Sequence, residues 1–378
     1  MSPLAVGIDV AAVPAEALGA GQYTVELVRA LGGRDDVALT LVARRDDGPR
    51  WRAVAPSATV LAIAPERRGA RLAYEELALS ATVRLRRAAF DVLHGPHYSL
   101  PMRPGCPCVV TVHDLTFVDH PEWHERSKVL YFRRALRLAA RRARVVVCVS
   151  ERTAQRFREL YDPEVPVVVV AHGVDHGRFA PVEGEPGADA SVLGRLGVRA
   201  PYVLHTGTIQ PRKDLATLVA AFNGIAGAHP DLVLVLAGGR GWATADLDEA
   251  IARSAHADRI ALLGHVADGD VAALVRNAAA VAYASLEEGF GLPALEALAC
   301  GTPLVTTEGS AMADVASGAA LLVGRRDADA LGRALGAALA EGPDIERLRR
   351  AGVARASRFT WAATASGHVD AYRLAAGR

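Results

Sequence analysis

The sequence predicts an α/β fold with two doubly wound, Rossmann-like domains, each a parallel sheet with helices on both faces. Short apolar runs rich in Val, Leu and Ile alternate with longer stretches of helical period, and this alternation occurs twice in the 378 residues. A chain of that length exceeds what one hydrophobic core usually organises. Residues 180–190, APVEGEPGADA, are rich in Pro, Gly and acid and have no apolar period. We therefore predict domains at 1–180 and 191–358.

The first half carries apolar runs with the length and composition of buried strands. We expect strands at 4–10, 37–42, 59–63, 91–94, 108–112, 145–149 and 166–171. Helical periods separate them near 21–32, 72–88, 127–142 and 151–160. This alternation is typical of parallel strands joined by helices.

The second half repeats the pattern. We expect strands at 202–206, 232–237, 260–262, 280–283, 303–306 and 320–323. The expected helices lie near 214–227, 245–256, 268–277, 293–299, 328–341 and 344–357. Two such domains place the carboxyl ends of two sheets face to face, and such crevices are where ligands of this fold class bind.

Composition and charge exclude several classes of protein. The chain is 51% apolar, 22% charged and 5% aromatic, which fits a globular protein and not a disordered one. A net charge of +1 gives no reason to expect a nucleic-acid partner. The charge is uneven, because residues 1–180 hold 25 basic and 20 acidic residues, a balance of +5, and the remainder holds 18 and 22, a balance of −4.

The N-terminus and the cysteines predict a cytoplasmic protein. The segment MSPLAVGIDVAAV has no basic region and carries Asp9 inside its apolar run, so it predicts a first buried strand rather than a signal peptide. The longest apolar runs are far shorter than the roughly 18 residues of a membrane span. The cysteines are too few and scattered for a disulfide framework, and Cys106-Pro-Cys108 lacks a second ligand pair for zinc.

The segment YVLHTGTIQPRKDLATLVAAF predicts a phosphate site. A strand ends at His205-Thr206, and a helix begins at Asp214, so Arg212 and Lys213 lie at a helix N-terminus. Two cations there are unfavourable unless an anion lies between them. Of the 43 basic residues only Lys128 and Lys213 are lysines. The alternative is two solvated loop cations.

The segment EEGFGLPALEALACGTPLVTT, residues 287–307, predicts a second anion-binding helix end. Pro293 suits a first helical turn, and Gly289 and Gly291 let a backbone approach a ligand. Glu288 precedes this turn and Glu296 lies about one helical turn beyond it. Carboxylates repel a diphosphate but accept hydrogen bonds from sugar hydroxyls, so the arrangement fits a nucleotide sugar. A solvated helix entrance is the alternative.

These residues resemble the donor site of family 4 of the retaining glycosyltransferases, which have the GT-B fold. The resemblance rests on EGFGLPALEA and on GTIQPRKDL at 207–215. Other matching segments span nearly the whole chain: HDLTF at 113–117, CVSERTAQRF at 148–157, HGVD at 172–175, LGHV at 263–266 and the final FTWAATASGHVDAYRLA. In similar proteins that last helix, here about 360–378, crosses back to the first domain.

The resemblance implies a role for each donor-site residue. Glu296 would bind the donor ribose, Glu288 with the backbone of Phe290 and Gly291 would hold the donor sugar, and Arg212 with Lys213 would bind the diphosphate. The implied donor site also includes Gly207, Thr208, His265, Val266, Gly289 and Leu292. We expect Arg212, Lys213, Glu288 and His113 to act in catalysis, with His113 reaching the sugar from the facing domain.

The loop Gly19-Ala20-Gly21 would close over the phosphate and shape the acceptor pocket. It is a variant of the family's usual paired glycines, and Thr208 stands where many relatives carry another arginine. The second difference matches a bacterial mannosyltransferase-like branch with GTI–PRK, whose members transfer mannose or related deoxysugars, so GDP-mannose is the favoured donor. We expect retention of the anomeric configuration, no metal, and a departing phosphate that takes the acceptor proton.

The acceptor is described only in outline. His94, His97 and Asp114 are candidates to contact it, although His94 and His97 also fit loop or core histidines. A glycan, a lipid-linked sugar or a small natural product would fit as acceptor. The basic segment 126–144 would allow peripheral contact with an anionic membrane, and an ordinary amphipathic helix packed on the sheet is the alternative.

Other functions explain fewer residues. Gly19 and Gly21 lack the third glycine and the ribose-binding acid of a dinucleotide fingerprint. A hydrolase using two glutamates would leave the phosphate-type helix ends unexplained. A sugar-nucleotide epimerase of the same fold and a non-catalytic binder remain open. Asp268-Gly269-Asp270 resembles a metal-binding pair, but a helix cap is the expected role.

Overall fold

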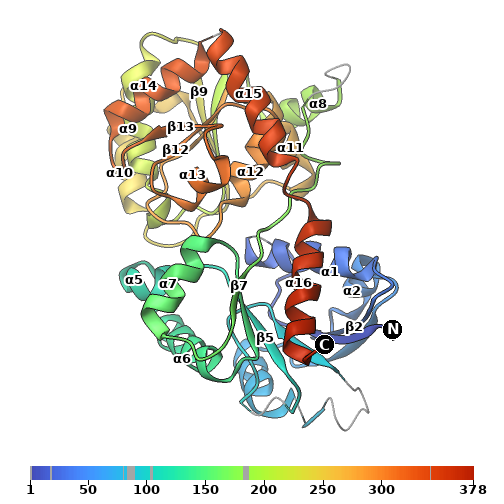
Figure 1. Ribbon diagram of the computed structural model, residues 1–378. Coiled ribbons are helices and arrows are strands. Elements are labelled where there is room, and N and C mark those ends of the chain that lie inside the picture. Colours follow the sequence, from blue (N-terminus) through green and yellow to red (C-terminus); the bar gives the residue numbers. More distant parts are fainter. Residues whose placement is uncertain are drawn as a thin grey trace. The chain divides into compact units, whose positions relative to one another are not determined.

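The computed structural model describes residues 2–17, 19–79, 81–82, 90–102, 105–181, 187–340 and 342–378. The chain forms two compact units, one of Met1–Gly173 with Trp361–Arg378 and the other of Val174–Thr360 (Figure 1). The division therefore falls before the expected linker 180–190. Residues 182–186 of that segment lie outside the described residues, and α8 (Gly187–Leu196) begins within it.

The first unit contains a seven-stranded parallel sheet within the described residues, in the order β3-β2-β1-β4-β5-β6-β7. The strands are β1 (Leu4–Asp9), β2 (Val37–Arg44), β3 (Thr59–Ala64), β4 (Val92–Gly95), β5 (Cys108–Val112), β6 (Val145–Cys148) and β7 (Val167–Val169). They match the expected strands to within a few residues. Both faces of the sheet are covered, so its residues read as continuous apolar runs.

Helices of the first unit follow most of its strands. They are α1 (Ala20–Gly32), α2 (Gly48–Val54), α3 (Arg68–Ala73), the π-helical turn η1 (Tyr74–Ala78), α5 (Thr116–Asp119), α6 (Arg126–Arg142), α7 (Glu151–Tyr161) and α16 (Trp361–Ala376). The short α2 and α5 were not expected. The expected helix 72–88 is described only in part, because residues 80 and 83–89 lie outside the described residues.

Helix α16 is anchored in the first unit by buried polar groups. It packs on α1 and on β4, β5 and β6 (Figure 1). Tyr23 OH lies 2.7 Å from His368 Nε2 and 3.0 Å from Thr111 Oγ1. His94 Nε2 lies 2.8 Å from the same threonine, and its Nδ1 lies 2.8 Å from Tyr372 OH. All five side chains are buried, so this network fixes where the helix sits.

The second unit contains a six-stranded parallel sheet within the described residues, in the order β10-β9-β8-β11-β12-β13. Its strands are β8 (Tyr202–Thr206), β9 (Val233–Ala237), β10 (Ile260–Gly264), β11 (Ala280–Tyr283), β12 (Leu304–Thr307) and β13 (Leu321–Val323). The alternation of strands and helices, with one parallel sheet in each unit, confirms the predicted α/β class with two Rossmann-like domains.

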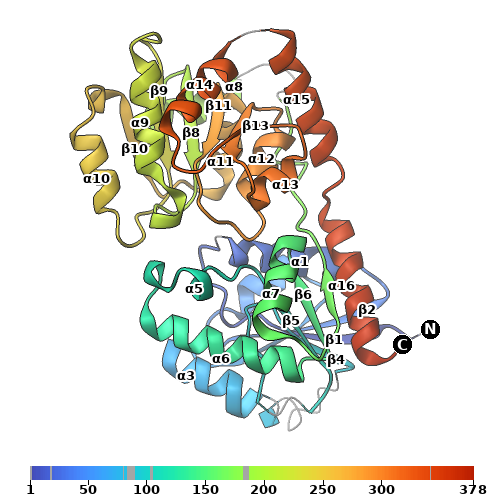
Figure 2. The ribbon, with the colours of Figure 1, turned by 60° about the vertical axis from the view of Figure 1, so that its left-hand side comes forward.

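Helices of this unit form two groups by their contacts with one another (Figure 2). One contains α9 (Leu215–Ala226), α10 (Ala245–Ala252) and α14 (Ala328–Leu339); the other contains α11 (Asp268–Asn277), α12 (Leu292–Ala299), α13 (Ala311–Ala316) and α15 (Pro343–Ala356). The short α13 was not expected, and residue 341 of the expected helix 328–341 lies outside the described residues. Among the described residues, none of the helices has the length and apolar content to cross a bilayer.

Candidate functional site

The second unit has its topological switch point between β8 and β11. From β8 the chain continues to β9 on one side, whereas β11 lies on the other. In open parallel sheets, ligands bind outside the carboxyl ends of two such strands. Residues 207–214 leave this edge after β8, and residues 284–291 leave it after β11. A backbone hydrogen bond of 2.8 Å from the amide of Leu286 to the carbonyl of Arg212 joins the two segments.

Arg212, Lys213 and Glu288 meet where these segments join. Arg212 Nη1 lies 2.5 Å from Glu288 Oε2, and Lys213 Nζ lies 2.5 Å from Glu288 Oε1. Arg212 also donates to the carbonyl of Glu287 at 3.0 Å. The side chains of Lys213 and Glu288 are 5% and 8% exposed. The structure thus places three predicted site residues in one buried group, called the cationic cluster below.

The cationic cluster keeps Glu288 ionised. Burial alone would raise the pKa of its carboxyl, but the charges and hydrogen bonds of Arg212 and Lys213 together outweigh burial and lower the pKa to about 2. Two cations face one carboxylate, so an excess positive charge of one remains. Such an excess in a buried place attracts an anionic group such as a phosphate.

His205, the penultimate residue of β8, lies near these charges. Burial, with the charge of Lys213, lowers its pKa to about 3, so the ring is neutral at pH 7. Its Nδ1 lies 3.1 Å from the carbonyl of Ala282 and must carry the proton, because a carbonyl only accepts. Its Nε2 is buried without a hydrogen-bond partner among the described residues. Sequence reasoning treated this histidine only as a strand end.

Glycines shape both segments at the switch point. Gly207 has φ +123°, and its carbonyl oxygen lies 2.0 Å from where a Cβ on Gly238 would stand. Gly291 has φ +101°, and a Cβ there would lie 2.5 Å from Cγ of Met312. A side chain at Gly238 would clash with the backbone of Gly207 and one at Gly291 with the side chain of Met312 on α13, and positive φ favours glycine at Gly207 and Gly291. The glycine pattern of the sequence therefore has a backbone reason.

Helix α12 begins at Leu292 with Gly291 as its N-cap, and no side chain caps it. Its positive dipole end points to the same sheet edge as the cationic cluster. The expected row of free amides is shorter than predicted, however. Pro293 has no N–H, and the amides of Ala294 and Leu295 both donate to the carbonyl of Gly291. The two basic side chains therefore supply most of the positive potential.

Glu296 lies about one turn into α12 and is 8% exposed. Burial raises the pKa of its carboxyl to about 8; Arg178 opposes this rise, and Asp268 adds to it. Arg178 itself pairs with Asp268 at 2.9 Å. Glu288 and Glu296 thus differ in charge state at pH 7, with the first ionised and the second mostly protonated. Perturbed carboxyls of this kind are typical of functional sites.

The other expected donor residues of this unit also follow the carboxyl ends of its strands. Thr208 is half-buried after β8, Val266 is buried after β10, and the neighbouring His265 is exposed. Phe290 is 6% exposed and meets Phe359 edge-on, with ring centroids 6.1 Å apart. Two expected donor residues are half-buried beside it: Gly289 and Leu292. All of them share the edge of the sheet that carries the cationic cluster.

His113 directly follows β5 in the first unit and is 7% exposed. Its Nε2 lies 2.7 Å from the carbonyl of Pro96, so Nε2 carries the proton and Nδ1 is left as an acceptor. Burial lowers the pKa of this ring, and the Pro96 bond opposes that only in part. A neutral, oriented imidazole suits the positioning role that we predicted for it.

The acceptor candidates differ in how many of their hydrogen-bonding atoms already have partners within the protein. His94 is fully buried, and both ring nitrogens serve the α16 network, so its placement favours the core alternative. Asp114 accepts from the amide and hydroxyl of Thr116 at 3.1 and 2.8 Å, which makes it a turn residue. His97 keeps a buried Nε2 with no hydrogen-bond partner among the described residues. Burial lowers the pKa of His97 to about 3.

The glycine loop opens helix α1. Gly19 is the N-cap and has φ +53°, and Gly21 lies in the first turn, where a Cβ would stand 3.4 Å from Cβ of Ala17. Gly19 is thus needed for the left-handed turn into the helix. Leu18 lies outside the described residues.

The aspartates 268 and 270 have another role than the predicted cap. The N-cap of α11 is Ala267, and no side chain caps the helix. Asp268 and Asp270 lie in its first turn, where negative charge is favourable, and pair with Arg178 and Arg195 at 2.9 and 3.0 Å. The described residues contain no group of three or more His, Cys, Asp or Glu that could hold a metal ion.

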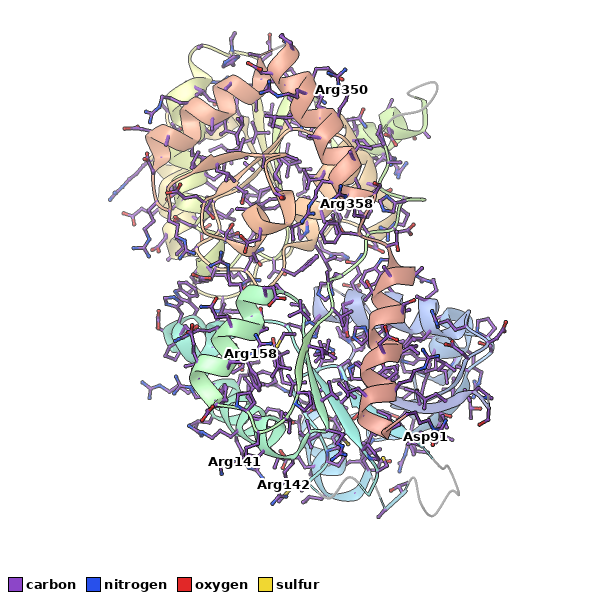
Figure 3. All side chains as sticks on the ribbon, viewed as in Figure 1. Asp91, Arg141, Arg142, Arg158, Arg350 and Arg358 are labelled. Carbon is purple, nitrogen blue, oxygen red and sulfur yellow. The ribbon has the colours of Figure 1, made fainter. Side chains whose placement is uncertain are left out.

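The basic segment 126–144 is helix α6 and its exit. Several of its basic side chains have partners within the unit: Lys128 with Glu125, Arg133 with the carbonyl of Val118, Arg134 with Glu76, and Arg142 with the carbonyl of Met102. Arg137, Arg141 and Arg144 are exposed, and Leu130 is 70% exposed. Figure 3 shows Arg141 and Arg142 at the C-terminal end of the helix.

Sequence reasoning missed one group of charged residues in the first unit. Asp9 ends β1, Arg71 lies on α3 and Glu75 lies on η1. The charges of Asp9 and Arg71 both act on the carboxyl of Glu75. A charge at the end of a buried strand was a usable signal for Asp9. Nothing in the local sequence marked Glu75, which follows the neighbouring Tyr74 in a run of ordinary helical appearance.

Two family models match the chain. The model described as Glycosyltransferase Family 4 matches residues 18–178, and the model described as Glycosyl transferases group 1 matches residues 195–355. Among curated relatives, O-antigen chain mannosyltransferase B of Escherichia coli is 29% identical over 287 residues, which cover 75% of this chain and 74% of that protein. D-inositol 3-phosphate glycosyltransferase of Actinosynnema mirum is 35% identical over 327 residues, covering 78% and 75%.

Solved structures share the fold at low identity. Sucrose-phosphate synthase from Thermosynechococcus elongatus has a TM-score of 0.78 at 21% identity, with 98% of each chain covered. HepE from Anabaena, in complex with UDP and glucose, has a TM-score of 0.76 at 19% identity, covering 97% of this chain and 99% of that one. With the two family models and these relatives, the chain belongs to the family 4 glycosyltransferases, the glycosyl transferases group 1, and has the GT-B fold.

Proposed function

We propose that the protein moves a hexose or deoxyhexose from a nucleotide sugar to a glycan, lipid-linked or small-molecule acceptor, with retention of the anomeric configuration. The observation that carries this proposal is the cationic cluster of Arg212, Lys213 and Glu288 at the switch point of the second unit. Its excess positive charge lies at the sheet edge where this fold class binds ligands. A nucleotide diphosphate carries the opposite charge.

The cluster supplies what the leaving group needs. When the bond to the sugar breaks, negative charge grows on the departing diphosphate, and fixed positive groups that are already in place stabilise it without reorganising. Arg212 and Lys213 are held in place by Glu288 and by the carbonyl of Glu287. The dipole of α12 adds to their potential.

The two glutamates divide the polar recognition of the donor. Glu288 is ionised and accepts hydrogen bonds from hydroxyls of the donor sugar. When the donor binds, Glu288 gives up part of its contact with the two cations, and the diphosphate then lies beside Lys213. Glu296 lies further along α12 and would bind the ribose diol. His113 offers Nδ1 as an acceptor and acts in positioning, so no separate catalytic base is assigned and the departing phosphate takes the proton.

Two finer features of this mechanism need their own experiment. Transfer is expected to need no metal, because fixed cations already provide the positive charge that a divalent ion would supply. The assay is transfer in excess EDTA, with the anomer of the product determined by NMR. Activity that EDTA abolishes and magnesium or manganese restores, or an inverted product, would refute this part of the proposal.

GDP-mannose is the donor we favour, because the GTI–PRK segment resembles a mannose-transferring branch and one relative bears the name of a mannosyltransferase. A structural neighbour was solved with UDP, so the base needs a direct test. Thermal unfolding of the purified protein with GDP-, UDP- and dTDP-sugars compares them. The largest stabilisation should come from GDP-mannose. A larger shift of the unfolding midpoint with another nucleotide sugar would make that compound the favoured donor.

An epimerase or hydrolase of the same fold is the second candidate. Both would use the same cationic cluster, so the donor site does not separate them from a transferase. Only a transferase releases nucleotide in proportion to new glycoside formed on an added acceptor. Nucleotide release that is independent of acceptor would favour the hydrolase.

We place the protein in the cytoplasm, with peripheral membrane contact through α6 if the acceptor is lipid-linked. The exposed Arg137, Arg141 and Arg144, with the exposed Leu130, would face the lipid. Sedimentation with vesicles that contain anionic lipid, compared with neutral vesicles, tests it. Binding that does not depend on anionic lipid contradicts this contact.

A further inference from the structure

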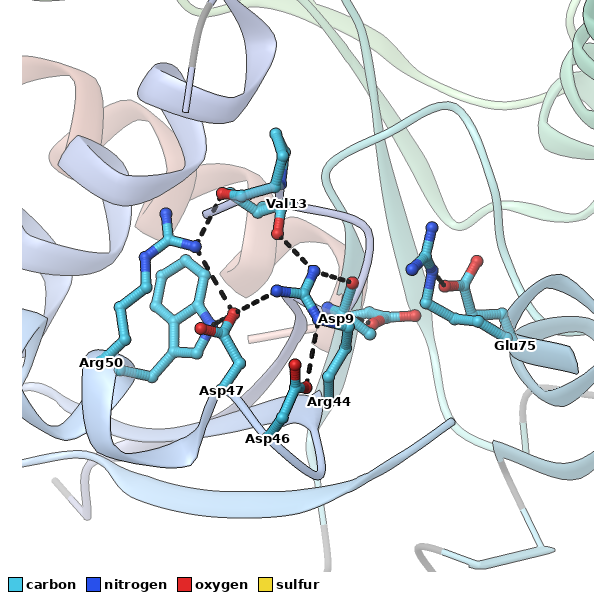
Figure 4. Close-up of polar contacts among 11 residues, drawn as sticks. Asp9, Val13, Arg44, Asp46, Asp47, Arg50 and Glu75 are labelled. Atoms are coloured by element: carbon cyan, nitrogen blue, oxygen red, sulfur yellow. Dashed lines mark hydrogen bonds and ion pairs between the residues drawn. The ribbon is translucent and has the colours of Figure 1, made fainter. Parts of the chain in front are cut away.

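The first unit has its own switch point, between β1 and β4. The chain runs from β1 to β2 and β3 on one side, and β4 lies on the other. Asp9 is the last residue of β1, and the turn after β4 begins at Gly95. By the rule that holds for open parallel sheets, this edge is a second place where a ligand binds. In Figure 4 the carboxyl of Asp9 points toward the side on which Glu75 lies.

Glu75 reaches this edge from a rare backbone turn. Residues 74–78 form a π-helical turn, a feature that frequently marks functional sites. Glu75 is 5% exposed, and its Oε1 lies 3.4 Å from Nε of Arg71. At that distance neither atom has a hydrogen bond within the described residues. A buried carboxyl and a buried guanidinium nitrogen therefore keep hydrogen-bonding capacity that the protein does not use.

A small hollow lies beside Asp9 and Glu75. It has about 10 Å³ of free space, room for about one water-sized group, and is lined by Asp9 and Glu75 together with Gly95, Ser99 and Leu100. The turn that forms its wall is strained, since Tyr98 has φ +63°. A Cβ on Gly95 would stand 1.9 Å from the carbonyl oxygen of Ser99. The turn is thus held tightly against the hollow.

The two carboxyls are in different protonation states at pH 7. Burial, opposed by the amide of Ala11, raises the pKa of Asp9 to about 6, which leaves it mostly ionised. Burial and then the charge of Asp9 raise the pKa of Glu75 to about 9, so Glu75 is protonated. One group accepts a hydrogen bond and the other can donate one. An alcohol does both, whereas a phosphate dianion only accepts.

Asp47 shows what a purely structural carboxylate looks like in the same unit. Its Oδ2 accepts from Trp51 at 3.0 Å and from Arg44 at 3.1 Å, and Arg50 lies 3.4 Å away (Figure 4). Asp47 is therefore saturated by its own neighbours. Glu75 has one cation at 3.4 Å and no hydrogen bond on Oε1. The contrast indicates that Glu75 is built for a partner outside the chain.

We propose that Asp9, Arg71 and Glu75 form an acceptor subsite that receives one alcohol group of an uncharged sugar or polyol and excludes acceptors with a phosphate at that position. The hollow takes a hydroxyl and is too small for a phosphate, and the ionised carboxylate of Asp9 can only accept a hydrogen bond, which an alcohol donates and a phosphate dianion cannot. The inference rests on the proposed transferase function, since it names the acceptor class of that enzyme.

The test uses the full chain and two matched pairs of probes, mannose with mannose 6-phosphate and myo-inositol with D-inositol 3-phosphate. Saturation-transfer NMR measures binding of each probe to the wild type, to Asp9→Asn and to Glu75→Gln, with the nucleotide that stabilises the protein most. We expect the neutral member of at least one pair to bind at least tenfold more tightly than its phosphate. Asp9→Asn should weaken that binding about tenfold, the effect of one hydrogen bond to a charged group, and Glu75→Gln, which keeps a donor, should weaken it by a smaller factor.

Asp47→Asn is the matched control, since it removes a buried carboxylate of the same unit that has no place in the subsite. It should leave probe binding within twofold of the wild type. Equal or tighter binding of the phosphates, no binding of either neutral probe, or unchanged binding in both subsite variants overturns the proposal. Nucleotide binding is measured in parallel by calorimetry. Sugar binding without nucleotide binding counts against the proposed transferase function. Nucleotide binding without sugar binding counts against the subsite alone.

Discussion

The two sheets have the same kind of switch point but differ in the charge at it, because the second unit has an excess positive charge of one and the first unit has none. In the second unit, Arg212 and Lys213 face the single carboxylate of Glu288. In the first unit, the carboxyls of Asp9 and Glu75 face the single guanidinium of Arg71. The topology places a binding edge in both units, and a few side chains after the strands decide whether that edge attracts phosphate or hydroxyl groups.

The difference also reverses the response to pH. The pKa of Glu288 is lowered to about 2 in the folded protein, so its stabilising contribution is present above its ordinary pKa of 4.5 and is lost as pH falls through 2. The pKa of Glu75 is raised to about 9, so its contribution to stability falls as pH rises from 4.5 to 9. Glu288 is thus tied to its neighbours, whereas Glu75 is held at a cost to stability.

The largest expected effect comes from removing the cations of the second unit. Arg212→Ala and Lys213→Ala should each lower turnover about 100- to 1,000-fold, because a fixed donor to the developing charge is lost. Each should weaken nucleotide diphosphate binding by about 1.5 to 3 kcal/mol, the range for a charge-assisted bond. Calorimetry and steady-state kinetics on folded variants measure both. Unchanged nucleotide affinity in both variants would contradict the assignment of Arg212 and Lys213 as the phosphate site.

Glu288→Gln should separate turnover from nucleotide binding. The change deprives the donor sugar of its proposed partner and leaves the cations to the phosphate, so turnover falls more than affinity for free nucleotide diphosphate. Glu296→Gln should weaken both, since it touches the ribose. Kinetics and calorimetry on the two variants give the comparison. Equal patterns in the two would contradict the separate roles.

A smaller effect is expected from pH in the second unit. If ribose hydroxyls donate to the ionised carboxylate of Glu296, binding requires deprotonation of a group whose pKa is about 8, and nucleotide affinity should rise up to about tenfold between pH 7 and pH 9. Burial lowers the pKa of the facing Arg178, but its bond to Asp268 holds that pKa above its ordinary value, so Arg178 keeps its charge across this window. Calorimetry across that range measures the rise. Glu296→Gln should abolish it, and a rise that persists in this variant would contradict the assignment.

The smallest effect concerns stability in the first unit. Glu75→Gln should leave the midpoint of thermal unfolding at pH 8 equal to or a few degrees above that of the wild type, because it removes a carboxyl whose ionisation opposes folding. Asp47→Asn should lower the midpoint by several degrees, since it leaves the donors of Arg44 and Trp51 unsatisfied. Asp9, Arg71, Glu76 and Tyr131 act on Glu75, so the pH scan is repeated in Asp9→Asn. A marked loss of stability in Glu75→Gln would assign that residue a structural role.

Much of the fold was predictable because buried parallel strands leave a strong local signal. The expected strands agree with β1 to β13 within a few residues, whereas α2 and α13 are too short to show a helical period. Arg212, Lys213 and Glu288 were predicted as neighbours of one ligand. Their direct ion pairing was not, because it depends on how two loops distant in sequence meet. Glu75 was missed because a π-helical turn has no sequence signature.

The docking of α16 has a consequence for synthesis on the ribosome. The first unit needs residues 361–378, which are translated only after all of Val174–Thr360. Until His368 and Tyr372 arrive, Tyr23 and His94 each lack one of the partners that satisfy them in the core. We therefore expect the first unit to finish folding after the second, against the usual order in which the N-terminal domain folds first during synthesis. All residues of the second unit, which holds the cationic cluster, leave the ribosome before the first unit is complete. The first unit begins to be translated earlier but receives its last helix at the end of synthesis.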